Sequence, residues 1–306
     1  MKKGIVIITI GVIVLSMYFG CKKDGFLKEQ PFYFSSIEEF KANNNGLSDS
    51  ALIGKLIFFD TTLSIPAGVS CATCHSPMTG FADPRGNSFS LGSTGMFGRR
   101  NANAISYMVF APNKRGEVIR GIWETAGGFF WDGKAEFLNQ QALFPLVDPK
   151  EMNLPNHGVA SEKIKHAPYF PMMVKLFGKN TLVDSQTIIF HAISCIQAFE
   201  MTYQVNPFTS KFDFYLQGKV KLTEQEMHGM ELFNDTIKTK CSLCHLSTPT
   251  PYATTDRILF TDFSYDNIGL PKNPLQIGQP IDSGLAIFEM NKPLEVGRFK
   301  TPTLRN

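Results

Sequence analysis

A five-residue pattern, Cys-x-x-Cys-His, constrains this chain most: it occurs at residues 71–75 and again at residues 241–245. This spacing is typical of covalent attachment of c-type haem. Two thiols three residues apart can each form a thioether to one haem vinyl group, and the adjoining histidine then lies under the iron as an axial ligand. The sequence therefore predicts two haem sites. Their candidate residues are Cys71, Cys74, His75, Cys241, Cys244 and His245.

Two other interpretations of the cysteine pairs are weaker. Two Cys-x-x-Cys pairs with histidines could supply tetrahedral ligands to zinc, but a zinc site does not need histidine directly after the second cysteine in both copies. A thioredoxin-like redox pair expects a βαβ context and has no use for that histidine. Cys195 lies in an apolar-rich helical stretch together with His191, which predicts two buried side chains. No even set of cysteines remains for disulfides.

The chain before each motif follows the same plan. A glycine is followed four residues later by phenylalanine and two residues further by aspartate, at 54–60 and at 229–235. Each copy lies in a predicted helix: the polar pair at 48–49 can cap the first, and Thr223 with Glu226 forms a capping box before the second. This repeat of helix, loop and haem motif predicts two cytochrome-c-like haem domains in a mainly α fold with long loops.

Between the motifs lies more chain than one small cytochrome needs. The stretch 80–100 is rich in glycine and serine, and we expect it to be irregular and to cover the haem. Helices are predicted over 136–143, ending before Pro145, over 161–177 and over 186–202.

The N-terminus indicates export. Lysines at positions 2 and 3 precede an apolar run that ends near residue 19, as in a secretory signal peptide spanning 1–20. Cys21 at its end is similar to the acylated cysteine of a bacterial lipoprotein, followed by a polar tether over 21–45; ordinary cleavage or an uncleaved anchor is the alternative. Export to the periplasm agrees with c-type haem. The net charge of +3 is too small to argue for nucleic acid.

The order of these motifs resembles the bacterial di-haem cytochrome c peroxidase family, which includes the di-haem enzymes that mature methylamine dehydrogenase. Besides the two haem motifs, the matching segments are Gly-Lys-Leu-Ile-Phe-Phe-Asp at 54–60, Gly-Arg-Arg-Asn-Ala at 98–102, Phe-Trp-Asp-Gly-Lys-Ala at 130–135, Glu-Met at 151–152 and Phe-Lys-Thr-Pro-Thr-Leu-Arg-Asn at 299–306.

This resemblance implies two unequal haems. The haem on His75, in an N-terminal domain over 46–205, would react with hydrogen peroxide. The haem on His245, in a C-terminal domain over 206–306, would receive electrons from a small donor such as cytochrome c and pass them to the first. The peroxidases of this family are commonly dimers, so a homodimer is expected.

The resemblance also implies roles for single residues. Glu151 matches the family's acid/base glutamate and Gln141 its distal-pocket glutamine. Trp131 matches an aromatic residue between the haems, and Asn101 matches a ligand of an inter-domain calcium. From the residues alone, a solvated loop carboxylate is the favoured interpretation of Glu151. Trp131 could be a core aromatic and still lie between the haems.

Two departures from the family pattern matter. Many members carry a distal haem ligand in the glycine-rich loop, but no histidine occurs over 90–95, so we expect an open peroxide site that needs no reductive activation. His157 is the nearby substitute. Family members also continue past Leu-Arg-Asn, with the second haem's distal ligand and further calcium ligands, so the C-terminal domain ending at Asn306 is expected to be incomplete. Met290 could be a substitute ligand, but this is the weaker interpretation.

Together these features predict an enzyme that reduces hydrogen peroxide to water with electrons from a cytochrome c or similar donor. A non-catalytic di-haem electron carrier is one alternative, and a peroxide-driven oxidase of the methylamine-dehydrogenase-maturing type is the other. Glu151, Gln141 and the missing loop histidine favour the peroxidase over the carrier, because a carrier needs no acid/base group.

Overall fold

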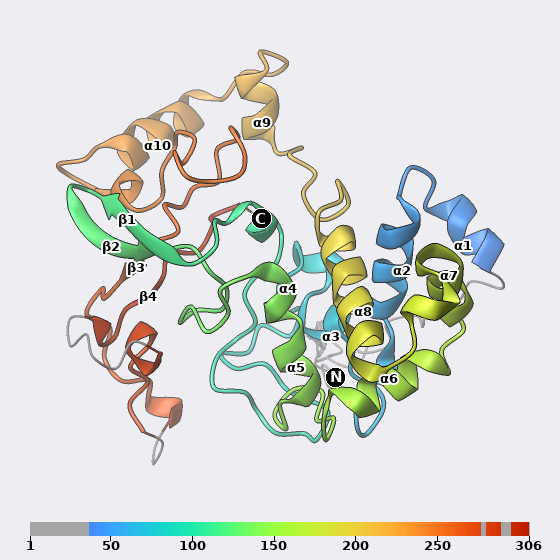
Figure 1. Cartoon of the computed structure of the whole chain (residues 1–306). Helices are drawn as coiled ribbons and strands as arrows, with labels where there is room; N and C mark the ends of the chain where they lie inside the picture. Colours follow the sequence, from blue (N-terminus) through green and yellow to red (C-terminus); the bar gives the residue numbers. More distant parts are fainter. Residues whose placement is uncertain (1–36, 277–279, 289–294, 306) are drawn as a thin grey trace, which may run out of the picture.

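The computed structural model describes residues 37–276, 280–288 and 295–305. The expected signal peptide, the lipid-anchor site at Cys21 and the substitute ligand Met290 lie outside these residues. The described part is mainly helical, with two small two-stranded sheets, as predicted (Figure 1). None of its helices combines the length and apolar character that crossing a membrane requires.

Five helices form one side of the molecule around the larger hydrophobic cluster (Figure 1). They are α1 (Ile37–Asn43), α2 (Asp49–Phe58), α6 (His157–Lys165), α7 (Phe170–Phe177) and α8 (Ser185–Glu200). Helices α2 and α8 make the most extensive contact between any two described elements. The core of the first half of the chain is therefore built on this pair.

The α2–α8 contact depends on a glycine. A side-chain carbon added to Gly54 would lie 1.8 Å from the carbonyl oxygen of Cys195, so only glycine lets the two backbones approach this closely. Ser48 caps α2 by accepting a hydrogen bond from the backbone of Ala51 at 3.2 Å, as predicted. The predicted burial of Cys195 is confirmed, whereas His191 is half-buried and stacks on a phenylalanine ring.

The prediction of one helix over 136–143 that ends before a proline is wrong. Two short helices, α4 (Leu138–Gln141) and α5 (Leu143–Val147), follow one another there, and Pro145 lies inside α5. A proline is tolerated in the first turn of a helix because the amides of that turn have no partner within the helix.

The helix predicted over 161–177 is two helices. Helix α6 begins earlier, where Asn156 accepts a hydrogen bond from the backbone of Val159 at 3.1 Å, and ends at Lys165. Pro168 lies in the turn before α7, and a residue that precedes proline is disfavoured in helical conformation.

Helix α3 (Cys71–Cys74) packs into the larger hydrophobic cluster through Ala72, and the remaining elements lie on the other side of the molecule (Figure 1). They are α9 (Lys211–Leu216), α10 (Glu224–Asn234), β1 (Arg115–Ile119), β2 (Ile122–Ala126), β3 (Tyr265–Asp266) and β4 (Phe299–Lys300). Strands β1 and β2 form an antiparallel hairpin with Ile119 opposite Ile122, and β3 pairs with β4 with Tyr265 opposite Lys300. The hairpin packs beside β3, far from it in sequence.

A second hydrophobic cluster joins residues from both sides of residue 206. Its members are Tyr107, Met108, Ala111, Phe129, Ala135, Leu259 and Phe263. Near it, the buried ammonium of Lys300 donates to the carbonyl oxygens of Gly127 and Gly128. Arg305 forms a buried ion pair with Asp213 at 2.9 Å. These contacts tie the C-terminal end of the described chain to the segment that directly follows the hairpin and to α9.

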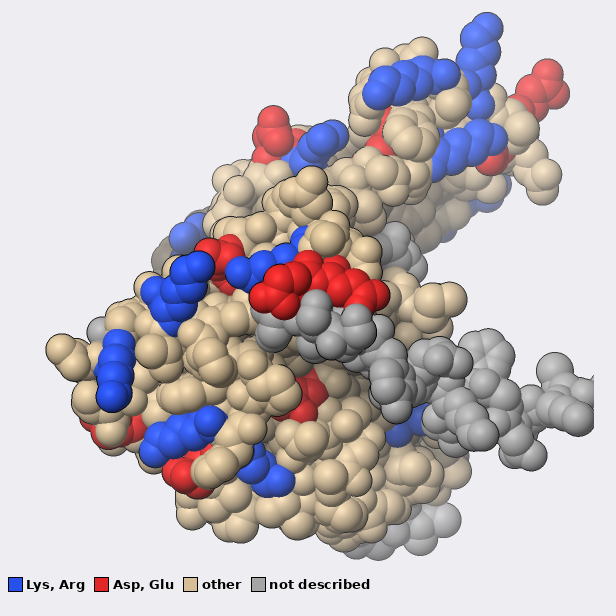
Figure 2. Space-filling view, turned by 90° about the vertical axis from the view of Figure 1, so that its right-hand side faces the viewer, with Lys and Arg blue, Asp and Glu red and all other residues tan. Residues whose placement is uncertain are grey.

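Helix α10 has its predicted capping box, in which Thr223 accepts from the backbone of Glu226 at 3.2 Å. None of its residues is buried, although Met230 and Phe233 follow at helical spacing and are half-buried. Figure 2 shows lysine and arginine side chains gathered at the top of the molecule, where α9 and α10 lie. The apolar side of α10 is thus partly uncovered by the described residues.

Replacing Gly54 by alanine should destabilise the protein strongly, because the added methyl group meets a backbone carbonyl that no rotamer change can move. We expect a loss of about 3 kcal/mol in the free energy of unfolding, measured by urea denaturation. Gly229→Ala is the matched control, because a side-chain carbon added to this glycine of α10 would meet no atom within 4 Å. The free energy of unfolding of this variant should rise by up to about 1 kcal/mol. Equal effects of the two substitutions would contradict this view of the α2–α8 contact.

Candidate functional site

The first haem motif begins as a short helix, α3, whose start is fixed by local hydrogen bonds. Ser70 precedes it, and the backbone amide of Ser70 donates to the Thr73 hydroxyl at 3.0 Å. Ala72 is fully buried in the larger hydrophobic cluster. The two cysteines of this motif are therefore anchored between a capped turn and the packed α2–α8 core.

The histidine of each motif is oriented in the same way. His75 Nδ1 lies 3.3 Å from the carbonyl oxygen of Phe81, and His245 Nδ1 lies 3.0 Å from that of Phe260. A carbonyl oxygen only accepts, so Nδ1 carries the hydrogen and Nε2 is left for a metal. Phe81 and Phe260 have positive φ angles of 61° and 52°, an uncommon conformation for an aromatic residue. The repeat thus extends to the carbonyl that orients each ring.

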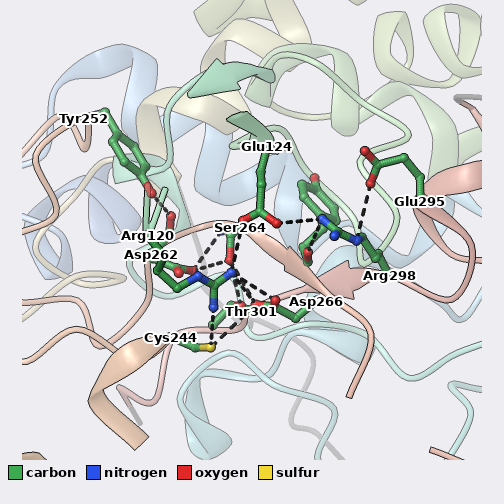
Figure 3. A network of polar contacts seen from close by, with 11 residues as sticks. Arg120, Glu124, Cys244, Tyr252, Asp262, Ser264, Asp266, Glu295, Arg298 and Thr301 are labelled. Atoms are coloured by element: carbon green, nitrogen blue, oxygen red, sulfur yellow. Dashed lines mark hydrogen bonds and ion pairs between the residues drawn. The ribbon is translucent and has the colours of Figure 1, made fainter. Parts of the chain in front are cut away.

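The second motif follows α10 as a single helical turn, Cys241–Leu243. Around it, Cys244, Asp262 and Asp266 place their side-chain atoms within 4.8 Å of one another (Figure 3). In the described part of the chain this is the one cluster of three or more such side chains, and no residue of the first motif belongs to it. The zinc interpretation, which needs ligands from both motifs, gains no support from this arrangement.

A cavity of about 620 Å³ lies beside the first motif. Its lining includes six residues that the sequence singled out: Cys74, His75, Asn101, Trp131, Gln141 and Glu151. A smaller cavity next to it is lined by Cys71 and again by Gln141 and Glu151. The structure therefore brings together all the residues predicted for the first haem and its distal side, although they come from five separate segments.

The walls of the larger cavity suit a flat apolar group. Among them are Leu91, Ile105, Met108, Phe129 and Leu138, and the volume is in the range of cofactor sites. At the second motif, the half-buried apolar side of α10 packs against the turn that carries Cys241. The residues present at both motifs therefore fit a covalently bound haem.

Glu151 has the electrostatic character of an acid/base group. Burial raises the pKa of its carboxyl to about 7, with a further contribution from the nearby charge of Asp148, while Lys134 opposes the shift. Lys134 is itself held over the ring of Phe144, 4.1 Å from its centroid. Glu151 can accordingly hold or release a proton near neutral pH inside the cavity.

The glycine-rich loop covers Glu151 closely. The amide of Ser93 donates to the carbonyl oxygen of Glu151 at 2.7 Å. A side-chain carbon on Gly92 would lie 2.1 Å from the carbonyl oxygen of Lys150, so the approach requires glycine. His157 does not line the cavity; its Nε2 lies 3.0 Å from the carbonyl oxygen of Leu143. Among the described lining residues of this cavity, His75 is the one histidine.

Trp131 is fixed from two sides. Its indole nitrogen donates to the carbonyl oxygen of Asn101 at 3.0 Å, and its own carbonyl accepts from the amide of Lys300 at 2.8 Å. Arg100, next to Asn101, forms ion pairs of 2.6 Å with Asp132 and 2.7 Å with Asp282. The predicted inter-haem tryptophan therefore lies where segments from both halves of the chain meet.

Glu200 is a residue of this site that the sequence analysis missed. It lines both cavities, is buried, and burial raises the pKa of its carboxyl to about 8. A signal was present, because Glu200 falls in helical register with the buried Ile189, Ile193 and Ile196 of α8. A carboxyl on the apolar face of a helix is uncommon unless a site needs it.

Comparison with known proteins identifies the family. Residues 48–221 match the family model for di-haem cytochrome c peroxidases. The methylamine utilization protein MauG of Paracoccus denitrificans is 36% identical over 269 residues, which covers 84% of this chain and 67% of the relative. The cytochrome c551 peroxidase of Nitrosomonas europaea is 30% identical, covering 88% of this chain and 69% of the relative. This chain belongs to the di-haem cytochrome c peroxidase family.

Solved structures of similar proteins support the same family assignment. The di-haem peroxidase BthA of Burkholderia thailandensis superimposes with a TM-score of 0.74 at 33% identity, over 84% of this chain and 65% of that protein. A MauG-like protein associated with microbial copper homeostasis has a TM-score of 0.64 at 27% identity. The chain thus spans about two thirds of the length of the relatives that it matches.

Replacing Glu200 by glutamine should stabilise the protein increasingly as the pH rises from 5 to 8. The folded pKa of about 8 lies above the ordinary value of 4.5, so ionisation in this window favours the unfolded chain, and the natural protein loses up to about 1.4 kcal/mol per pH unit that the variant keeps. The free energy of unfolding, measured with urea between pH 5 and 8, tests this prediction, and Glu231→Gln at an exposed position of α10 is the control. A stability difference that does not change with pH would contradict the burial of this carboxyl.

Proposed function

We propose that this protein is a di-haem c-type peroxidase that reduces hydrogen peroxide to water with electrons from a small donor such as cytochrome c. The observation that carries the proposal is the carboxyl of Glu151, with a pKa of about 7, in the same cavity as His75 and Gln141. Reduction consumes one peroxide, two electrons and two protons and yields two water molecules, so a group that moves protons at neutral pH is what the site needs.

Six residues would hold the two haems: Cys71, Cys74 and His75 in an N-terminal domain over 46–205, and Cys241, Cys244 and His245 in a C-terminal domain over 206–306. When bound, the first haem supplies the iron at which peroxide accepts its electrons. The carbonyls of Phe81 and Phe260 keep each imidazole hydrogen on Nδ1, which leaves Nε2 free to serve as the axial ligand.

Glu151 and Gln141 have different roles in the proposed reaction. Glu151, as a carboxylate, would take a proton from one peroxide oxygen and return it to the other, which then leaves as water. Gln141 offers an amide donor and acceptor from the same cavity and can hold the peroxide in line. The loop that carries Gly92 lies directly against the Lys150–Glu151 backbone, and burial raises the pKa of the Glu151 carboxyl.

Electrons would enter at the His245 haem and reach the first haem through Trp131. In support, the indole is fixed by Asn101, and its backbone is joined to β4 from the other half of the chain. The lysines near the second motif at positions 219, 221, 238 and 240 are exposed, which favours a donor with an acidic surface. Asn101 would also contribute to an inter-domain calcium site.

The location and assembly of the protein follow from the same proposal. Covalent haem attachment and the signal peptide expected over 1–20 support a periplasmic location with a lipid anchor on Cys21, and the family pattern favours a homodimer. One alternative activity has a specific observation in its favour. The methylamine utilization protein MauG of Paracoccus denitrificans is 36% identical, so a peroxide-driven oxidase acting on a protein or organic molecule is the second candidate.

Replacing Glu151 by glutamine should slow the reaction of the oxidised, haem-loaded protein with hydrogen peroxide by about a hundredfold, because glutamine cannot move the proton. Stopped-flow absorbance of the haem bands measures the rate. In the natural protein the rate constant should rise as the pH passes upward through about 7, since the carboxylate is the active base, and this rise should vanish in the variant.

The control for this test is Glu231→Gln, which removes an exposed carboxylate that does not line the cavity and should leave the rate unchanged. A Glu151→Gln protein that reacts at the natural rate would remove Glu151 from the mechanism. A natural protein that is inert in both the oxidised and the half-reduced state would instead support the electron carrier.

A further inference from the structure

An arginine contacts the second cysteine of the first haem motif and is itself immobilised. Arg85 donates to the Cys74 sulfur at 3.1 Å, to the Asp83 carboxylate at 2.8 Å and to the carbonyl oxygen of Leu91 at 2.8 Å. The side chains of Arg85 and Asp83 are 14% and 5% exposed. With its donors directed at three fixed acceptors, the guanidinium cannot follow the sulfur if the sulfur moves.

The second haem motif has a similar arrangement, made from different parts of the chain, and here the Cys244 thiol also donates to the Asp266 carboxylate at 3.5 Å. Arg120 donates to the Cys244 sulfur at 2.9 Å and to the Asp266 carboxylate at 3.0 Å, with Glu124 at 3.2 Å on its other side (Figure 3). Arg120 lies at the tip of the β1–β2 hairpin with a positive φ of 52°, and it reaches across 124 residues of sequence. The hairpin therefore brings an arginine–aspartate pair to the second motif.

The first cysteine of each motif has no such pair. Within the described residues, no hydrogen bond to a side chain reaches the Cys71 sulfur, and the Cys241 sulfur contacts the backbone oxygen of Thr239 at 3.7 Å. The pattern is thus specific to the cysteine that directly precedes the histidine. Its recurrence at two motifs, through arginines of unrelated sequence position, is the observation that requires an explanation.

We propose that these two arginine–aspartate pairs position the sulfurs of Cys74 and Cys244 for addition to a haem vinyl group, and that each arginine stays hydrogen-bonded to the resulting thioether. The inference rests on the proposed haem attachment. In the addition, sulfur bonds to the vinyl carbon next to the ring and the thiol hydrogen goes to the outer vinyl carbon, with no net gain or loss of electrons. Sulfur accepts a hydrogen bond as thiol and as thioether, so the contact persists.

The second cysteine is where positioning matters most. Because it directly precedes the histidine, the location of its sulfur decides how the haem ring lies against the imidazole. A free thiol can rotate about its side-chain torsion, and a fixed donor selects one orientation before the vinyl group arrives. Loss of one charge-assisted hydrogen bond corresponds to a roughly tenfold effect on the selected population.

The test compares haem attachment in protein produced with a c-type haem attachment system. Arg120→Met and Arg85→Met remove the sulfur contact and keep the length of the side chain. Arg298→Met is the matched control, because Arg298 bonds Glu124 at 2.9 Å in the same network without touching a sulfur. Mass spectrometry of proteolytic peptides gives the share of chains with a thioether at each cysteine, independently of any activity.

In Arg120→Met we expect chains without the Cys244 thioether to increase roughly tenfold, while Cys241 and the first motif stay complete. Arg85→Met should show the mirror result at Cys74, and Arg298→Met should match the natural protein. Complete thioethers in both arginine variants would overturn the inference. A natural protein without covalent haem would overturn the proposed function itself.

Should Arg120→Met yield no folded protein, Glu124→Gln decides the matter. Glu124 contacts Arg120 and Arg298 and not the sulfur, so this variant keeps Arg120 bonded to Asp266 but loosens the guanidinium, and a smaller increase in chains lacking the Cys244 thioether is expected. Complete attachment in Glu124→Gln would then overturn the inference.

Discussion

The hydrogen bond from each motif histidine to a phenylalanine carbonyl is the interaction on which both sites depend. It fixes the ring, the tautomer and the nitrogen that faces the haem, and Phe81 and Phe260 adopt a left-handed backbone conformation where it is made. Such a conformation costs free energy, so the surrounding fold must enforce it. At the first motif the packed α2–α8 pair, with Gly54 at its closest contact, supplies that rigidity.

A few long-range contacts join the two halves of the chain. Lys300 from β4 holds the backbone of Trp131, its ammonium binds two carbonyls before that residue, and Arg100 connects Asp132 with Asp282. The β1–β2 hairpin reaches the second motif through Arg120. The tryptophan proposed to carry electrons is thus held by the same contacts that join the halves, so its position and the assembly of the fold are not independent.

Features that depend only on neighbouring residues could be predicted from the sequence. The two haem motifs, the cap at Ser48 and the capping box at Thr223 follow from neighbouring residues, and the structure confirms the caps. Pro145 misled the prediction because its cost depends on where a helix begins, which distant packing sets. Arg120 and Glu200 could not be assigned to their sites, since only the folded chain shows that a hairpin tip meets Cys244 and that a helix end faces the cavity.

We propose that the first haem site has an open distal side, where Glu151 stands in place of a second iron ligand. Electron paramagnetic resonance of the resting, fully oxidised protein is the measurement that tests this open site. We expect a high-spin ferric signal from the first haem that is unchanged in His157→Ala, because the His157 ring is bound to the Leu143 carbonyl outside the cavity. A spectrum with low-spin signals alone would show a bound distal ligand, and the distal side would then not be open.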